Sequence, residues 1–231
     1  MDDGAADLSI SLQMAAIAVE EGIEIVACTP HILPGVYNND GPQIEAARRD
    51  LSRRLAEAEI PLALICGADA HIAPDMIAGL RSGRIPTLNG SRYLLLEPPH
   101  YVAPPRLTDF AFQLMTAGYV PILTHPERLS WIESHYEVIC SLAGNGVMMQ
   151  LTGGSLMGRF GRRPRYWAER MLDEGLIDLM ATDAHDPLRR PPRLAEARDE
   201  VARRWGDVLA LALVLGRPLD VLENRAPDVG R

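Results

Sequence analysis

The sequence predicts an α/β fold built on a parallel sheet, of the barrel-like or doubly wound kind. Apolar runs of strand length alternate with segments of helical periodicity, which is typical of βαβ units. The runs contain few polar residues, as expected of strands that are covered on both faces. A length of 231 residues with 47% apolar content suits one domain, and no linker interrupts it, so we expect residues 1–231 to form a single domain.

The expected elements follow one another in regular order. Strands are predicted at 23–29, 61–67, 92–97, 119–125, 147–152 and 177–185. Helices are predicted at 8–21, 42–59, 74–80, 106–117, 134–143, 164–174 and 193–204, followed by an apolar C-terminal segment. The segment "PTLNGS" and the pair Asn145-Gly146 are expected to form turns.

Composition excludes several classes of protein. The net charge of −8 argues against a general nucleic-acid-binding protein. All 23 basic residues are arginine, which excludes Schiff-base and P-loop chemistry on lysine. Cys28, Cys66 and Cys140 lie far apart and are expected to be reduced core residues. Because no apolar run has the length of a membrane span and no signal-peptide pattern is present, we expect a cytoplasmic protein without membrane insertion.

Acidic residues and histidines follow most of the predicted strands. These residues are His31, Asp69, Glu97, His125, Asp183 and His185. The carboxyl ends of parallel strands meet at one face of the fold, which is where such folds place their functional residues. Carboxylate and imidazole are common ligands of divalent cations, and without a cation several carboxylates at one mouth would repel each other. The pattern therefore predicts a metal site.

Each of these residues also has a simpler interpretation. A single aspartate at a strand end is often the N-cap of the next helix, and a single histidine is usually an ordinary polar residue. Recurrence at equivalent strand ends is what favours the metal site. His71, His100 and His135 do not share this placement, and His135 is expected on the surface of the 134–143 helix.

Arginines lie close behind two of the strand-end histidines. Arg128 follows His125 by three positions, and Arg189 and Arg190 follow His185. A guanidinium group binds two phosphate oxygens at once, so arginines beside a metal cluster suit a phosphate-bearing substrate. The alternative for each is an ordinary solvated arginine.

The motifs "CTPH", "LTHPER", "LTGGSLMGRFG" and "TDAHDPLRRPP", with "PTLNGSRYLLLE" between them, give the chain a specific resemblance. It resembles the polymerase-and-histidinol-phosphatase (PHP) superfamily and, more narrowly, the bacterial capsule-type manganese-dependent protein-tyrosine phosphatases. The resemblance implies a distorted, TIM-like parallel (β/α)7 barrel that holds up to three divalent ions, usually Mn²⁺. It also implies the metal ligands Asp3, His31, Asp69, Glu97, His125, Asp183 and His185, and the phosphate-binding residues Arg128 and Arg190.

The chain departs from the family pattern at two places. The family has glutamate in a "GAE" segment, whereas Asp69 stands here in "GAD", with a side chain shorter by one methylene. The family also has a first strand ending in His-x-His before its "DDG" loop, but here Met1 precedes that loop directly and no His-x-His exists. We therefore expect the chain to lack the first barrel strand, to bind metal incompletely and to be weakly active or inactive. Restoring such a strand before Asp2 should raise manganese-dependent activity.

The resemblance implies metal-assisted hydrolysis of phosphotyrosine on a bacterial tyrosine kinase of capsule or exopolysaccharide assembly. No phosphocysteine intermediate is expected. One alternative is a small-molecule phosphoesterase of the superfamily, such as a histidinol phosphatase. Others are a catalytically impaired, phosphate-binding regulatory protein, and an α/β domain whose strand-end acids only cap helices. Nucleic acid is not expected as a partner, and the sequence leaves homo-oligomerisation open.

Overall fold

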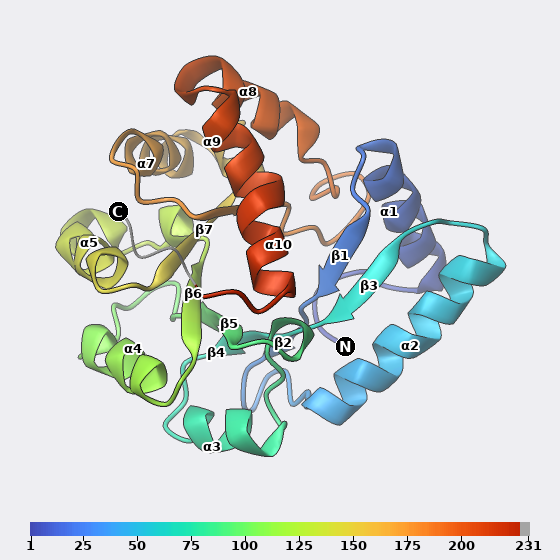
Figure 1. Ribbon diagram of the computed structural model, residues 1–231, viewed down its shortest axis with the longest axis horizontal. Helices are drawn as coiled ribbons and strands as arrows, with labels where there is room; N and C mark the ends of the chain where they lie inside the picture. The colour runs from blue at the N-terminus through green and yellow to red at the C-terminus, as the bar shows by residue number, and fades with distance from the viewer. Residues whose placement is uncertain (227–231) are drawn as a thin grey trace.

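Parallel strands and helices alternate along the computed structural model, which describes residues 1–226 (Figure 1). The strands are β1 (Ile25–Cys28), β2 (His31–Ile32), β3 (Ala63–Cys66), β4 (Asp69–His71), β5 (Tyr93–Glu97), β6 (Val120–Thr124), β7 (Met148–Thr152) and β8 (Leu179–Ala181). The α-helices before β8 are α1 (Leu8–Glu20), α2 (Gly41–Glu57), α3 (Met76–Ser82), α4 (Leu107–Thr116), α5 (Tyr136–Gly144), α6 (Gly153–Leu156) and α7 (Arg162–Asp173). After β8 come α8 (Ala195–Trp205), α9 (Asp207–Leu211) and α10 (Arg217–Leu222).

Short-range chemistry fixes where the first two helices begin. Asp7 precedes α1 and its carboxylate accepts a hydrogen bond from the Ile10 backbone N–H at 2.9 Å. Asp40 precedes α2 and accepts from the Gln43 N–H at 2.9 Å in the same way. Each carboxylate satisfies a backbone donor that has no partner within the helix.

All strand pairs are parallel, as predicted. The hydrogen-bonded order is β2-β4-β5-β6-β7-β8 in one sheet and β1-β3 in another. Among residues 1–226, β1 pairs only with β3 and β8 only with β7, so the backbone ladder does not close into a ring.

The two sheets continue one another across a break. Cys28 opposes Cys66, and three positions later His31 opposes Asp69, so the register is the same on both sides. Between them, the Gly67 N–H still donates to the Cys28 carbonyl at 3.0 Å. A Cβ at Gly67 would lie 2.7 Å from Cδ2 of Leu88, so glycine lets this side chain pack closely against the break. The predicted strands at 23–29 and 61–67 therefore each carry a second short strand beyond the break.

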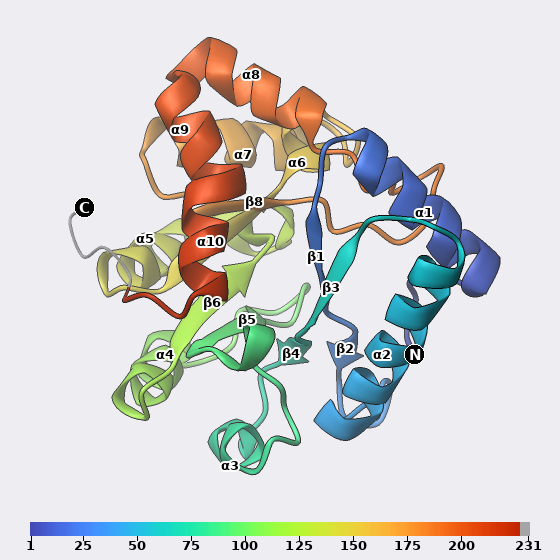
Figure 2. The same cartoon turned by 45° about the vertical axis from the view of Figure 1, so that its right-hand side comes forward.

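Alternate residues of the central strands pack into two different layers. On one face, Tyr93, Leu95, Ile122, Met148 and Leu179 form an inner cluster with Val221 of α10. On the other face, Leu94 and Leu96 pack with α2, α3 and α4, while Leu123, Met149, Leu151 and Met180 pack with α5, α7 and α8. Figures 1 and 2 show helices arranged around the strands. Burial on both faces explains why these strands are continuous apolar runs.

A few local expectations were wrong. His135 lies just before α5 rather than inside a helix, and its ring contacts the edge of Trp131. The short helix α6 directly after β7 was not expected. The apolar C-terminal segment is helical, because α9 continues through a π-helical stretch, Ala212–Gly216, into α10. No helix within the described part of the chain has both the length and the apolar character needed to cross a bilayer.

Candidate metal centre and phosphate-binding site

The inner face of the strands changes from apolar to polar at their carboxyl ends. Leu95 of β5 belongs to the inner cluster, and Glu97 lies two residues further along the same face. Thr124 of β6 stands in the same relation to Ile122, and its hydroxyl lies 3.4 Å from Oδ1 of Asp69. The strand alternation thus directs a layer of polar side chains to one end of the sheet.

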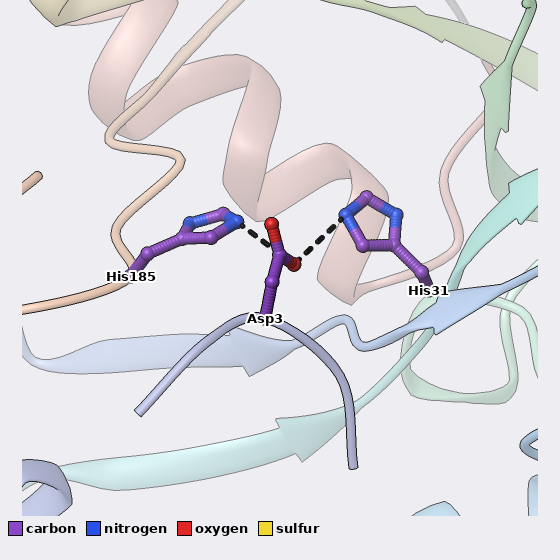
Figure 3. Close-up of side chains that lie close together, drawn as sticks. All are labelled: Asp3, His31 and His185. Atoms are coloured by element: carbon purple, nitrogen blue, oxygen red, sulfur yellow. Dashed lines mark ion pairs between the residues drawn. The ribbon is translucent and has the colours of Figure 1, made fainter. Parts of the chain in front are cut away.

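Asp3 joins two histidines that lie far apart in the sequence. Its Oδ1 lies 3.6 Å from Nε2 of His31 and 3.4 Å from Nε2 of His185 (Figure 3). The neighbouring Asp2 accepts a hydrogen bond from the His31 backbone N–H at 2.8 Å. This contact attaches the N-terminal loop to the start of β2, so that Asp3 lies between the two imidazoles (Figure 3).

A second group lies deeper, around Glu97. The Glu97 carboxylate lies 3.2 Å from Nδ1 of His31 and 3.7 Å from Nε2 of His125. Nε2 of His125 is also 3.8 Å from Oδ2 of Asp69. Asp69, Glu97 and His125 are all buried. Two carboxylates and two imidazoles therefore share a space largely closed to solvent.

The charges of this group are poorly balanced without a cation. Burial, and after it the charge of Glu97, raises the pKa of Asp69 well above its ordinary value. Burial and then Arg128 hold the pKa of His125 well below its ordinary value, and Nδ1 of this ring has no hydrogen-bond partner. A divalent cation would offset the repulsion between the carboxylates and use neutral imidazole as a ligand. The donor set fits such a cation.

His31 and Glu97 form a strongly interacting pair. The contact with Glu97 raises the pKa of His31 to about 9, against the opposing effect of burial. Burial by itself would raise the pKa of Glu97, but His31 outweighs it and the pKa is lowered. In the absence of metal, protonated His31 thus supplies the positive charge beside the Glu97 carboxylate.

Asp183 binds both arginines of the predicted phosphate site. The guanidinium groups of Arg128 and Arg190 both donate to Oδ2 of Asp183. Phe160 lies under both, with its ring centroid 4.4 Å from Cζ of Arg128 and 5.7 Å from Cζ of Arg190. His125 and Asp183 have left-handed backbones, with φ of 36° and 50°. Such conformations are costly outside glycine and concentrate at functional sites.

A family model for capsular polysaccharide synthesis proteins, CpsB/CapC, matches residues 1–223. The chain belongs to the CpsB/CapC family. It is 32% identical to tyrosine-protein phosphatase YwqE of Bacillus subtilis (strain 168) over 213 residues, which is 92% of this chain and 84% of the relative. It is 31% identical to the putative tyrosine-protein phosphatase CapC of Staphylococcus aureus over 191 residues, which is 83% of this chain and 75% of the relative.

The fold matches that of solved members of the CpsB/CapC family. The match is to a chain from crystal structures of YwqE from Bacillus subtilis and CpsB from Streptococcus pneumoniae, described as unique metal-dependent tyrosine phosphatases. The TM-score is 0.94 at 31% identity, and the match covers 98% of this chain and 91% of that chain. The predicted PHP-type fold and the predicted family are therefore confirmed.

The residues predicted for the site converge at one end of the sheet. Three overlapping groups have ligand atoms within 4.8 Å of one another: Asp3 with His31 and His185, His31 with Asp69 and Glu97, and Glu97 with His100 and His125. Asp183 belongs to none of them. Its Oδ2 pairs with the arginines, and its Oδ1 lies 3.8 Å from Nδ1 of His185. The metal-binding role of these residues stays a prediction.

Sequence reasoning missed four residues around this site: Asp2, His100, Glu127 and Phe160. His100 does not end a strand, although it stands three positions after Glu97. Phe160 lies in the "LTGGSLMGRFG" motif, but nothing in its spacing indicates a ring beneath two arginines. Its position depends on the turn after α6, which only the tertiary structure defines.

Glu127 connects the "HPER" loop to the end of β7. Its side chain is fully buried and accepts hydrogen bonds from the Ser155 hydroxyl at 2.7 Å and the Thr152 N–H at 3.2 Å. Its other oxygen, Oε2, has no hydrogen-bond partner. Burial raises the pKa of Glu127 from 4.5 to about 7. The carboxyl group thus fixes the loop between His125 and Arg128 at a cost that depends on pH.

We expect Glu127→Gln to stabilise the metal-free protein more at pH 8 than at pH 4. Between pH 4.5 and about 7 the folded state holds more protons on this carboxyl than the unfolded state, so stability falls as pH rises. Over this range the raised pKa lowers the free energy of unfolding by about 3 kcal/mol. The neutral amide of the variant does not ionise and so does not suffer this loss. Urea unfolding at both pH values measures the effect, with exposed Glu133→Gln as the control. An equal change in stability at both pH values would contradict the raised pKa.

Proposed function

We propose that this protein is a metal-dependent phosphomonoester hydrolase that removes phosphate from phosphotyrosine on a protein. The proposed substrate is a bacterial tyrosine kinase that acts in capsule or exopolysaccharide assembly. The observation that carries the proposal is the junction at Asp183, where two arginines meet beside a buried carboxylate and imidazole cluster. The names of the relatives support phosphotyrosine as the substrate class.

One set of side chains in the site would bind cations, and a second set would bind phosphate. Asp3, His31, Asp69, Glu97, His125, Asp183 and His185 would hold the metal, for which we propose Mn²⁺ with other divalent ions as substitutes. A bound divalent ion supplies charge neutralisation at the phosphate and lowers the pKa of a coordinated water. The three overlapping groups are compatible with up to three ions.

Arg128 and Arg190 would bind the transferred phosphate. Their guanidinium groups are held side by side on Asp183 and against Phe160, so little rotational freedom remains to be lost when phosphate binds. Planar guanidinium groups match phosphate oxygens in pairs and stabilise the charge that spreads over them during transfer. We therefore assign these two residues the main catalytic role among the side chains outside the metal cluster.

We propose a cytoplasmic location, where a kinase domain would meet the phosphatase. Cys28 and Cys66 face each other in register on β1 and β3, yet both are free thiols, as is Cys140. Unpaired cysteines at adjacent positions suit a reducing compartment.

The function is tested by phosphate release from a phosphotyrosyl peptide and from histidinol phosphate, each with added Mn²⁺ or with a chelator. We expect manganese-dependent release that favours the peptide. Preference for histidinol phosphate would favour a small-molecule phosphatase. Binding of the peptide without release under any metal would favour a regulatory protein.

Phe160 offers a test of the arginine arrangement. We expect Phe160→Leu to weaken binding of inorganic phosphate and raise KM for the peptide about 2- to 30-fold, because the ring's attraction for the guanidinium groups is lost. Gly154 makes room for this ring, since a Cβ there would lie 3.1 Å from Cε2 of Phe160. Phe112→Leu on α4, at an exposed phenylalanine, is the matched control. Equal KM values in the two variants would contradict the role of Phe160.

A further inference from the structure

We infer that His100 is an additional ligand of the metal centre and completes, with Glu97 and His125, a site for one divalent cation. The inference rests on the proposed metal-dependent function and adds a residue that the family resemblance does not supply. His100 lies in the loop after β5, three residues beyond Glu97. The side chains of Glu97 and His125 that it joins are 10% and 4% exposed.

The geometry brings His100 to the metal cluster at Glu97 and His125. One ligand atom each from Glu97, His100 and His125 lies within 4.8 Å of the other two, a spacing that a single ion can bridge with bonds of ordinary length. The rings of His100 and His125 have centroids 5.0 Å apart and are tilted by 35°. The polar atoms of the three side chains thus converge on a common volume.

The backbone around His100 is fixed by a separate segment of the chain. The His100 carbonyl accepts hydrogen bonds from the Ser130 N–H at 2.9 Å and the Ser130 hydroxyl at 2.8 Å. The Pro99 carbonyl accepts from Nε1 of Trp131 at 2.9 Å. Arg163 in turn donates to the Ser130 carbonyl at 2.7 Å. A loop held at consecutive residues can place a side chain with the accuracy that a metal ligand needs.

Asp69 and His100 belong to different groups of candidate ligands. Asp69 forms a compact group with His31 and Glu97, whereas the compact group that contains His125 includes His100 instead. His125 also has a buried Nδ1 without a hydrogen-bond partner. The imidazole of His100 gives an ion beside Glu97 and His125 a third protein ligand.

The competing explanation is that His100 merely packs its ring against His125. His100→Phe separates the two, because phenylalanine keeps a planar ring and removes both nitrogens. We would measure Mn²⁺ binding to metal-free protein by equilibrium dialysis with metal analysis, using His135→Phe as the matched control at a histidine outside the cluster. We expect His100→Phe to weaken binding of one ion about 10- to 100-fold and the control to bind as the parent does.

A second variant gives a signal that ring packing cannot produce. Thiolate is a strong ligand for Co²⁺, so His100→Cys should add a sulfur-to-cobalt charge-transfer band that the parent and His135→Cys lack. Parental affinity in His100→Phe together with no new band in His100→Cys would overturn the inference, even if His100→Phe were poorly folded. Failure of the parent itself to bind Mn²⁺ or Co²⁺ would instead overturn the metal-dependent function, and with it this ligand.

Discussion

Replacing Arg128 with lysine is expected to lower kcat/KM for a phosphotyrosyl peptide about 100- to 1,000-fold. The guanidinium of Arg128 is held by Asp183 on one side and by the ring of Phe160 on another. Lysine keeps the positive charge but cannot donate two parallel hydrogen bonds to phosphate. The decrease in kcat/KM therefore reports the loss of the paired guanidinium donors rather than a loss of charge. Arg190→Lys should behave similarly, because Arg190 meets the same oxygen of Asp183.

Arg189→Lys is the matched control for both arginine variants. Arg189 is the exposed neighbour of Arg190 and carries the same charge. We expect this variant to keep the parental kcat/KM within about twofold, since exposed charges contribute little at a screened surface. Affinity for inorganic phosphate, measured by competition, provides a second readout that does not depend on a high turnover rate. If Arg128→Lys and Arg189→Lys behave alike in both assays, the phosphate-binding role of Arg128 is wrong.

Asp69→Asn is expected to lower kcat/KM by at least about 1,000-fold and to weaken metal binding, because a central anionic ligand becomes a neutral amide. Asp69 is buried and lies close to both Thr124 and His125. The amide has nearly the same shape, so the side chain should still fit its surroundings. Metal analysis after dialysis and phosphate release measure the two effects together. Asp109→Asn, at an exposed carboxylate on α4 that pairs with Arg106, is the control.

The same substitution should stabilise the metal-free protein at neutral pH and above. Burial and the charge of Glu97 raise the pKa of Asp69 above its ordinary value of 3.8. Above pH 3.8 the folded state then binds more protons than the unfolded state, and the free energy of unfolding falls as pH rises. The neutral amide of the variant removes that dependence, so the stability gained by Asp69→Asn over the parent should grow as the pH rises above 3.8. Parental activity and metal content in Asp69→Asn would show that Asp69 is not a ligand.

Opposite effects on stability and activity would be typical of a functional cluster. Like charges brought together in a buried space destabilise the fold until a ligand offsets them. A substitution that relieves this repulsion without affecting activity would instead indicate a polar layer with only a structural role, as in the interpretation of the strand-end acids as helix caps.

Much of the fold could be predicted from the sequence, because its signals are local. Continuous apolar runs such as "YLLLE" and "VMMQLT" could be recognised as strands since both of their faces are buried. Asp7 and Asp40 precede α1 and α2 as N-caps. The convergence of Glu97, His125 and His185 was also predictable, since residues that follow parallel strands must meet at the same end of the sheet.

The tertiary structure alone decided how those residues combine. Nothing local indicates that Gly67 permits a close approach of Leu88, that Asp183 holds two arginines at once, or that Ser130 anchors the loop bearing His100. Each depends on segments far apart in the sequence, whose relative placement is set by packing of the whole sheet and its helices. The sequence by itself determined which strand-end groups reach the site. Their distances, partners and charge balance arose only when the chain folded, because those quantities depend on separations in space rather than along the chain.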